Sequence, residues 1–296
     1  MKLPDAVRLM RPKHYIKNFL IFVSIVFDRD LFHPAVLVKV LGGFAAFCLL
    51  SSVVYIINDI NDVEEDRRHE VKKNRPIASG AVSAAQACVL AAVLAVCSLA
   101  LYVGVCGFRW SSFIFLLLYF VVNLGYSLGL KNVPFLDVVL LVSGFLLRVL
   151  FGAAIIDSTV SAWVSLTVVA LSFYLGLGKR RNELKKSTVS GGTRKVLGAY
   201  TYEFLDKFMY LCLTLAVAFY ALWSRDAEIV AKYGTENLVW TVPMLIVLLM
   251  KYSADIESDS YGDPVDVILG DKVLFLLGVV FVLTVLGMVY LPAMLH

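Results

Sequence analysis

Long apolar runs recur along this sequence, and they constrain the fold more than any other feature. A membrane-spanning α-helix needs about 20 mostly apolar residues, and eight segments approach or reach that length. They are Ala35–Ile57, Val82–Gly104, Ser111–Leu130, Phe135–Ile156, Val160–Gly178, Leu205–Trp223, Leu238–Met250 and Val273–Leu295. A ninth run, Ile16–Phe27, is shorter and interrupted. We therefore predict an all-α, polytopic membrane bundle of about nine transmembrane helices.

The composition supports a single integral-membrane domain over residues 1–296. The chain is 60% hydrophobic and 17% charged, more apolar than a soluble domain of this size can bury. No linker or low-complexity segment divides it. The N-terminal run has no small-residue cleavage site, and Arg11, Lys13 and Lys17 crowd its start, so we do not expect a cleavable signal peptide.

The basic residues predict the orientation in the membrane. If the N-terminus is cytoplasmic, 21 of the 27 Lys and Arg residues fall before the first span or in loops on the cytoplasmic side. The positive-inside rule therefore favours a cytoplasmic N-terminus, in a plasma or inner membrane. The net charge of +4 follows from the same rule and requires no nucleic acid as a partner.

Histidine and cysteine offer no metal or disulfide site. The five cysteines lie in or beside apolar spans and none forms a C-x-x-C pair, while the four histidines are scattered. We interpret the cysteines as small packing residues between helices.

Charge gathers in the stretch NDINDVEEDRRHEVKKNRPIASG, Asn58–Gly80, directly after an apolar span. If the helix continues to Asp66, then Asp59, Asp62 and Asp66 fall within about 60° of arc at 100° per residue. Three like charges on one face repel each other unless a cation lies between them. Hard oxygen ligands favour Mg²⁺, bound with substrate phosphates. The alternative is a solvated loop, balanced by basic neighbours such as Arg75.

Basic residues elsewhere suit a polyanion such as a diphosphate. Arg148 lies inside an apolar span, where a charge is costly and usually functional. Lys17, Lys131, Lys251 and the run Lys179–Arg181 lie at cytoplasmic helix ends. Taken alone, each is an ordinary positive-inside flank, and Lys179 with Glu183 could be a helix-surface pair. A second acidic group forms either a solvated loop or a lid: Asp255, Glu257, Asp259, Asp263, Asp266 and Asp271.

These residues resemble the UbiA superfamily of intramembrane prenyltransferases over nearly the whole chain. The family motif N-D-x-x-D-x-x-x-D reads here as Asn58, Asp59, Asp62 and Asp66. A YS-x-x-LK element reads as Tyr126, Ser127, Leu130 and Lys131. The resemblance implies that the motif holds Mg²⁺ against a diphosphate, with Asp59, Asp62 and Asp66 as catalytic residues.

One departure narrows the resemblance to a branch of the family. Where a second Asp-rich motif is usual, this chain has YLGLGKRRNEL, Tyr174–Leu184. Three features of this chain resemble the decaprenyl-phosphate phosphoribosyltransferases. They are that change, the opening RPKHYIKN at Arg11–Asn18 and the late KYSADIE. The branch implies transfer of a 5-phosphoribosyl group from phosphoribosyl diphosphate (PRPP) to a polyprenyl phosphate, in cell wall biosynthesis. The predicted substrate-binding residues are Lys17, Arg75, Tyr126, Lys131, Arg148, Tyr174, Lys179, Arg180, Glu183 and Lys251.

Other functions remain as alternatives. The nearest is a UbiA-type aromatic prenyltransferase of quinone or haem O biosynthesis, which shares the first motif but not the basic run. A transporter or channel would suit the intramembrane arginine, yet the charges cluster at one membrane face rather than at the midplane. A membrane scaffold would leave the ordered aspartates unexplained. A downstream epimerase is a possible partner of the phosphoribosyltransferase.

Overall fold

The fold is all-helical, as predicted. A computed structural model describes residues 1–69, 71–190, 195–257 and 263–294, and the described chain contains helices, turns and bends but no strand. Eight helices in this part are long and apolar enough to cross a membrane, and they match the eight longer predicted spans. The chain forms two compact units, Met1–Thr159 and Val160–His296, each described by itself below. The single-domain expectation stays a prediction.

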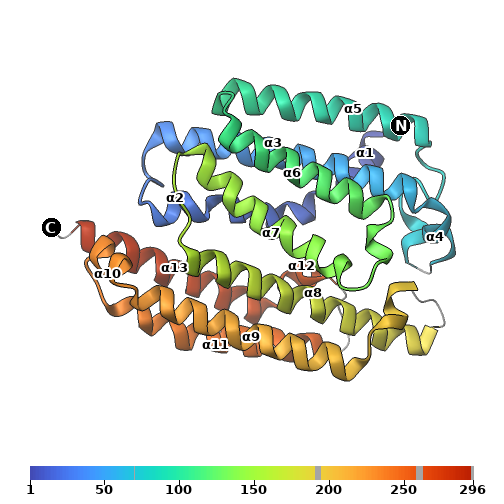
Figure 1. The fold of residues 1–296 in the computed structure, drawn as a ribbon. Helices are drawn as coiled ribbons and strands as arrows, with labels where there is room; N and C mark the ends of the chain where they lie inside the picture. Colours follow the sequence, from blue (N-terminus) through green and yellow to red (C-terminus); the bar gives the residue numbers. More distant parts are fainter. Residues whose placement is uncertain (70, 191–194, 258–262, 295–296) are drawn as a thin grey trace. The chain divides into compact units, whose positions relative to one another are not determined.

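The first unit is built around helices α3 and α7. Its elements are α1 (Leu3–Met10), η1 (Pro12–Phe22), α2 (Val23–Phe27), α3 (Pro34–Asn61), α4 (Val63–Arg68), η2 (Lys72–Asn74), α5 (Ala84–Leu101), η3 (Tyr102–Cys106), α6 (Trp110–Ser127), η4 (Leu130–Asn132) and α7 (Leu136–Ile155). More than half of the apolar window of α3 and of α7 is buried, against 22% for α5 and α6. Within this unit α3 lies between α5 and α6 (Figure 1).

Aromatic packing holds the middle of this unit together. Phe47 of α3 contacts the rings of Tyr119 on α6 and Phe151 on α7, with centroids 4.4 and 5.3 Å apart. All three side chains are almost fully buried. Because lipid is as apolar as these rings, close packing rather than exclusion from water orders the helices.

The ninth predicted span, Ile16–Phe27, has a different form. Its residues lie in the 3₁₀ helix η1 and the short helix α2, and the segment is not among the eight spanning helices of the described chain. The helix η1 has 11 residues, which is long for a 3₁₀ helix because such helices seldom exceed about four residues. The described residues therefore contain eight of the nine predicted spanning helices, and the ninth predicted span is an irregular segment instead.

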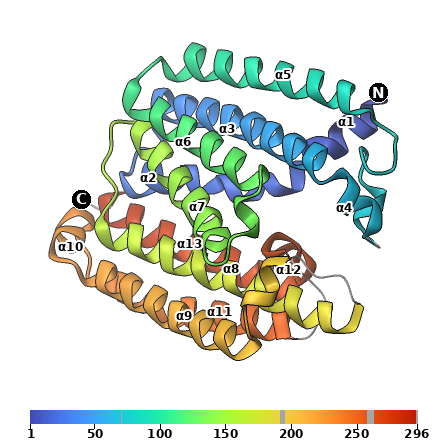
Figure 2. The ribbon, with the colours of Figure 1, turned by 45° about the vertical axis from the view of Figure 1, so that its right-hand side comes forward.

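The described residues of the second unit contain four spanning helices joined by short ones. Its elements are α8 (Ala162–Ser190), η5 (Lys195–Ala199), α9 (Tyr202–Arg225), α10 (Ala227–Tyr233), η6 (Asn237–Trp240), α11 (Thr241–Glu257), α12 (Pro264–Gly270) and α13 (Lys272–Met294). Helix α8 packs along α9, and α11 packs on α13 (Figure 2). Trp223, Tyr233 and Leu238 are fully buried between these elements.

Candidate functional site

The acidic motif lies at a break between two helices. Helix α3 ends at Asn61 and α4 begins at Val63, and Asp62 between them leaves the helical conformation with φ −93° and ψ 6°. The expectation of one uninterrupted helix from Asn58 to Asp66 is therefore wrong. The break is mild, because Asp66 N still donates to Asp62 O at 2.8 Å.

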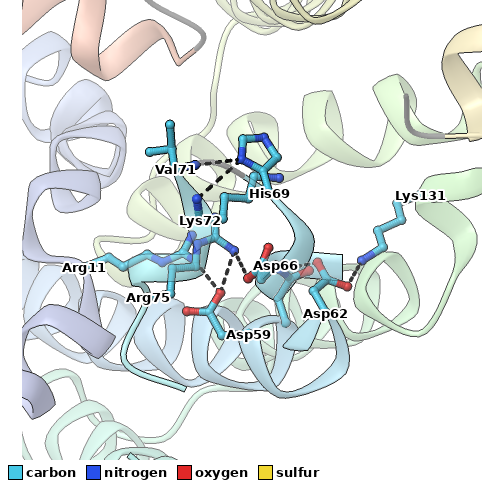
Figure 3. Close-up of polar contacts among 10 residues, drawn as sticks. Arg11, Asp59, Asp62, Asp66, His69, Val71, Lys72, Arg75 and Lys131 are labelled. Carbon is cyan, nitrogen blue, oxygen red and sulfur yellow. Dashed lines mark hydrogen bonds and ion pairs between the residues drawn. The ribbon is translucent and has the colours of Figure 1, made fainter. Parts of the chain in front are cut away.

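Asp59 and Asp66 converge on one arginine. Arg75, at the end of η2, donates from a single nitrogen to Asp59 Oδ1 at 3.0 Å and to Asp66 Oδ2 at 2.6 Å (Figure 3). Arg11 donates to the same oxygen of Asp59. The residues Asp59 and Asp66 are only 2% and 3% exposed, so these carboxylates are removed from water and held by charge-assisted bonds. Their repulsion is offset by the arginines.

Asp62 points to a different partner. Its Oδ2 accepts a hydrogen bond from Asn58 Nδ2 at 2.9 Å, and its Oδ1 pairs with Lys131 of η4 (Figure 3). Lys131 is buried despite its charge, with 8% of its side chain exposed. Two of the three predicted aspartates thus share one arginine, and the third pairs with a lysine.

This arrangement fits Mg²⁺ bound together with a substrate. Magnesium commonly binds through one or two carboxylates and completes its shell with substrate phosphates and water. Asp59 and Asp66 already direct oxygens to a common position that a positive charge occupies. No group of three or more His, Cys, Asp and Glu among the described residues is placed to hold an ion by itself. The geometry therefore suits a shared metal site and not a closed protein cage.

Arg11 is a part of this cluster that the spacing of residues did not reveal. It lies 48 positions before its partner Asp59, too far for any helical periodicity to connect them. Its backbone adopts the left-handed conformation, with φ 54° and ψ 58°, at the junction of α1 and η1. Burial lowers the pKa of the Arg11 guanidinium and the Asp59 carboxylate raises it; an arginine still stays charged at neutral pH. Only its place in the opening RPKHYIKN pointed to it.

The other predicted residues of the first unit are Lys17, Tyr126 and Arg148. Lys17 on η1 and Tyr126 on α6 are half-buried. Arg148 on α7 is 5% exposed and donates to Asn18 Oδ1 at 2.7 Å, to Gly144 O at 2.6 Å and to the Tyr119 hydroxyl at 3.1 Å. Its guanidinium also lies over the Tyr119 ring, 4.7 Å from the centroid.

The predicted residues of the second unit lie in the middle part of α8 and on α11. Tyr174 shares a hydrogen bond with Ser253 at 2.6 Å. Lys179 reaches Asp263 at 3.5 Å, and Arg180, which is fully buried, pairs with Glu183 at 2.6 Å. Lys251 pairs with Asp255 and with Asp271, the latter at 2.7 Å.

The late acidic residues are partners of the basic run. Arg181 binds Asp206 at 2.9 Å and Glu257 at 2.5 Å, and it stacks over the Tyr202 ring. Spacing along the sequence did not predict these two carboxylates together. Of the predicted acidic group, Asp255, Glu257, Asp263 and Asp271 each form an ion pair with a lysine or arginine of α8 or α11, and Asp259 lies outside the described residues. The basic residues of α8 and α11 and these acidic residues thus form an ion-pair network.

Comparison with known proteins gives consistent similarities. The model of one family, the UbiA prenyltransferase family, matches residues 19–179. The chain is 33% identical over 299 aligned residues to the decaprenyl-phosphate phosphoribosyltransferase of Mycolicibacterium smegmatis, covering 96% of this chain and 92% of the relative. The protein of the same name from Corynebacterium glutamicum is 31% identical, covering 97% of this chain and 87% of the relative.

Solved structures share the fold. A UbiA homologue from Archaeoglobus fulgidus bound to GPP and Mg²⁺ aligns with a TM-score of 0.71 at 19% identity, covering 97% of this chain and 99% of that one. A digeranylgeranylglyceryl phosphate synthase aligns with a TM-score of 0.63 at 17% identity, covering 97% of both chains. At these identities the likeness concerns the fold alone.

Proposed function

Because this chain belongs to the UbiA prenyltransferase family, we propose that it transfers a 5-phosphoribosyl group from PRPP to a polyprenyl phosphate and releases diphosphate. The observation that carries the proposal is the similarity to decaprenyl-phosphate phosphoribosyltransferases, which extends over 96% of the chain. That range includes the second unit, where the basic run Lys179–Arg181 stands.

The chain is an integral membrane protein, with eight apolar helices in its described part. We place it in the plasma or inner membrane with the acidic motif facing the cytoplasm, because the basic residues favour that side. PRPP is a soluble phosphorylated sugar and would reach such a site from the cytoplasm. The polyprenyl chain would stay in the bilayer.

The aspartates would hold Mg²⁺ with the diphosphate of PRPP. Asp59 and Asp66 are the proposed carboxylate ligands, with Asp62 and Asn58 beside them. When bound, the ion would neutralise charge on the leaving diphosphate. Arg75 pairs with both carboxylates and Arg11 pairs with Asp59, so the two arginines orient these groups while they are out of water. Lys131 does the same for Asp62.

The chemistry of transfer needs no general base. The bond from ribose C1 to the diphosphate oxygen breaks as C1 becomes oxocarbenium-like, and a phosphate oxygen of the lipid forms the new bond from the opposite face. This nucleophile is already an anion, so no side chain has to remove a proton. Attack from the opposite face inverts C1 and gives a β-linked phosphoribosyl lipid. Lys17, Tyr126, Tyr174, Lys179, Arg180 and Lys251 remain predicted contacts of the substrates.

A labelled-donor assay tests this function. Membranes containing the chain are incubated with PRPP labelled in the ribose and with decaprenyl phosphate, and the mass of the lipid product is measured. We expect label in the lipid, a mass increase of one phosphoribosyl group, and loss of turnover on chelation that Mg²⁺ restores. Prenylation of a hydroxybenzoate from polyprenyl diphosphate, without lipid labelling by PRPP, would instead identify an aromatic prenyltransferase.

A further inference from the structure

Arg148 is a buried cation with hydrogen bonds to three elements of the first unit. It lies in the apolar helix α7, where an uncompensated charge is costly. Its three hydrogen bonds run to Asn18 on η1, to Gly144 one turn earlier on α7 and to Tyr119 on α6. The rings of Phe47, Tyr119 and Phe145 surround the guanidinium. These groups satisfy the guanidinium through neutral oxygens and aromatic faces.

The contacts of Arg148 close into a ring that includes η1. Asn18 accepts from Arg148 through its oxygen and donates through its nitrogen to Cys48 Sγ at 3.1 Å and Ser51 Oγ at 3.5 Å, both on α3. The Ser51 hydroxyl in turn lies 3.2 Å from the Tyr119 hydroxyl, which accepts from Arg148. Asn18 has no exposed surface. The ring therefore ties η1 to three helices in the interior of the unit.

A glycine places the backbone of η1 directly on α7. Four residues after Arg148, a Cβ at Gly152 would lie 2.1 Å from the carbonyl oxygen of Ile21. Only a residue without a side chain allows this approach. Arg148 and Gly152 lie on one face of α7, and they contact Asn18 and Ile21 of the same 3₁₀ segment.

The other end of η1 leads to the acidic motif. Tyr15 shares a hydrogen bond with Ser52 of α3 at 2.8 Å, and Ser52 donates to Met10 O at 3.0 Å. Arg11, immediately before η1, pairs with Asp59. The segment η1 contacts both α7 and α3, and its fixed position therefore places Arg11 beside Asp59, the carboxylate that we propose binds the metal.

We propose that Arg148 is a positioning residue that anchors η1 through Asn18 and so holds Arg11 on Asp59. The proposal rests on the function above and revises the expectation that Arg148 clamps a substrate phosphate. Its effect on transfer is indirect and passes through Asn18, η1 and Arg11. A phosphate ligand would act without Asn18 and without Arg11.

Hydrogen exchange tests the anchor without any activity measurement. Purified full-length protein in lipid nanodiscs is compared as wild type, Asn18→Ala, Arg148→Lys and the double variant, with deuterium uptake read in peptides covering residues 12–22. We expect faster uptake there in both single variants and none of that change in residues 84–101. Ser98→Ala is the matched control, since it removes another buried hydrogen bond of this unit, to Ala46 O, without touching η1. Unchanged uptake at residues 12–22 in both variants would overturn the proposal.

Kinetic coupling tests how the anchor acts on transfer. We expect Asn18→Ala and Arg148→Lys each to lower kcat/KM for PRPP about tenfold to a hundredfold, because each misplaces Arg11. The double variant should have a kcat/KM no lower than that of the weaker single variant. In an Arg11→Ala background, Arg148→Lys should have little further effect. Independent, multiplicative losses would identify a direct substrate ligand and contradict positioning.

A conservative variant guards against general misfolding. Asn18→Asp offers Arg148 a carboxylate in place of an amide oxygen, so we expect it to retain slow exchange at residues 12–22 and most of the activity. Rapid exchange in this variant would count against the Asn18 link. If PRPP were not a substrate at all, the proposed function would fail while the exchange result would still decide whether Arg148 anchors η1.

Discussion

Each carboxylate of the acidic motif is paired with a basic side chain that comes from another element of the same unit. Asp59 has Arg11 and Arg75, Asp66 has Arg75, and Asp62 has Lys131. Breaking one side of a buried ion pair costs about 3–5 kcal/mol because a charge stays behind without a partner. Substitutions here therefore have to be separated into effects on folding and effects on transfer.

Asp62→Ala should abolish transfer. We expect kcat to fall at least about a hundredfold, because losing one electrostatic contact in an active site has an effect of that size. The chain should still insert into the membrane and fold, because α3 keeps its buried apolar face. Transfer of label from PRPP and thermal unfolding are measured on the same preparations. Asp62→Asn keeps the size of the side chain and should be equally inactive.

Glu64→Ala is the control for this substitution. Glu64 lies two residues away and pairs with Arg67 on an exposed surface, where an ion pair contributes little. It should leave activity near wild type. Full activity of Asp62→Ala would remove the role assigned to this aspartate.

Lys179→Asp should impair the use of PRPP far more than the use of the lipid. The lysine contacts Asp263 at 3.5 Å, and the reversed charge would repel both that carboxylate and a substrate phosphate. KM is measured separately for PRPP and for polyprenyl phosphate, with Lys185→Asp, six residues further along α8, as the control. A defect confined to the lipid would contradict this assignment.

Between elements, close backbone contact and ion pairs fix the irregular segments. Helices α3 and α7 are held by apolar packing along their length. The 3₁₀ segment η1 has fewer of its own backbone hydrogen bonds in good geometry and depends on Gly152, Arg148 and Ser52. At the end of the second unit, ion pairs join α8 and α11 to their neighbours.

Gly152→Ala should destabilise the protein by about 1–3 kcal/mol, the usual range for an extra methyl group in a packed interior. The new Cβ would collide with the Ile21 carbonyl, which is backbone and cannot turn aside. The thermal unfolding temperature in detergent is the measurement. Gly278→Ala, in open space on α13, should be neutral or stabilising, and an equal effect of the two changes would argue against the contact.

The ion pair between Lys251 on α11 and Asp271, directly before α13, should weaken in acid. The hydrogen bond from the Lys251 side chain, with a smaller one from Leu274 N, holds the pKa of Asp271 below its ordinary value. A carboxylate with a lowered pKa in the folded state stabilises the protein above about pH 4, the unfolded value, and loses that contribution as pH falls through the folded value. Unfolding temperatures of wild type and Asp271→Asn should therefore differ at pH 7 and converge on acidification. A difference that persists in acid would contradict this account.

For the whole chain, membrane orientation is the property on which access to PRPP depends. The five native cysteines are first replaced by alanine. The single substitution Arg68→Cys should then give a protein that reacts in intact cells only with a membrane-permeant maleimide. A cysteine at Arg109 should react with an impermeant one, because the sequence places these residues on opposite sides. Both side chains are exposed in the structure. The reverse labelling pattern would place the acidic motif outside the cytoplasm and remove the proposed route of PRPP.

Hydropathy and local spacing predicted the eight spanning helices, the membrane class and the acidic motif, because both depend only on neighbouring residues. Lys131 and Arg75 were also predicted as substrate contacts, and Arg75 was named as a neighbour that balances the acids in the alternative of a solvated loop. Tertiary structure alone decided that the helix breaks at Asp62, that Asp59 and Asp66 share Arg75, and that Arg11 joins them. It also decided that Arg148 meets Asn18, 130 positions away. Contacts between residues so far apart depend on how helices pack, and no local period in the chain records that.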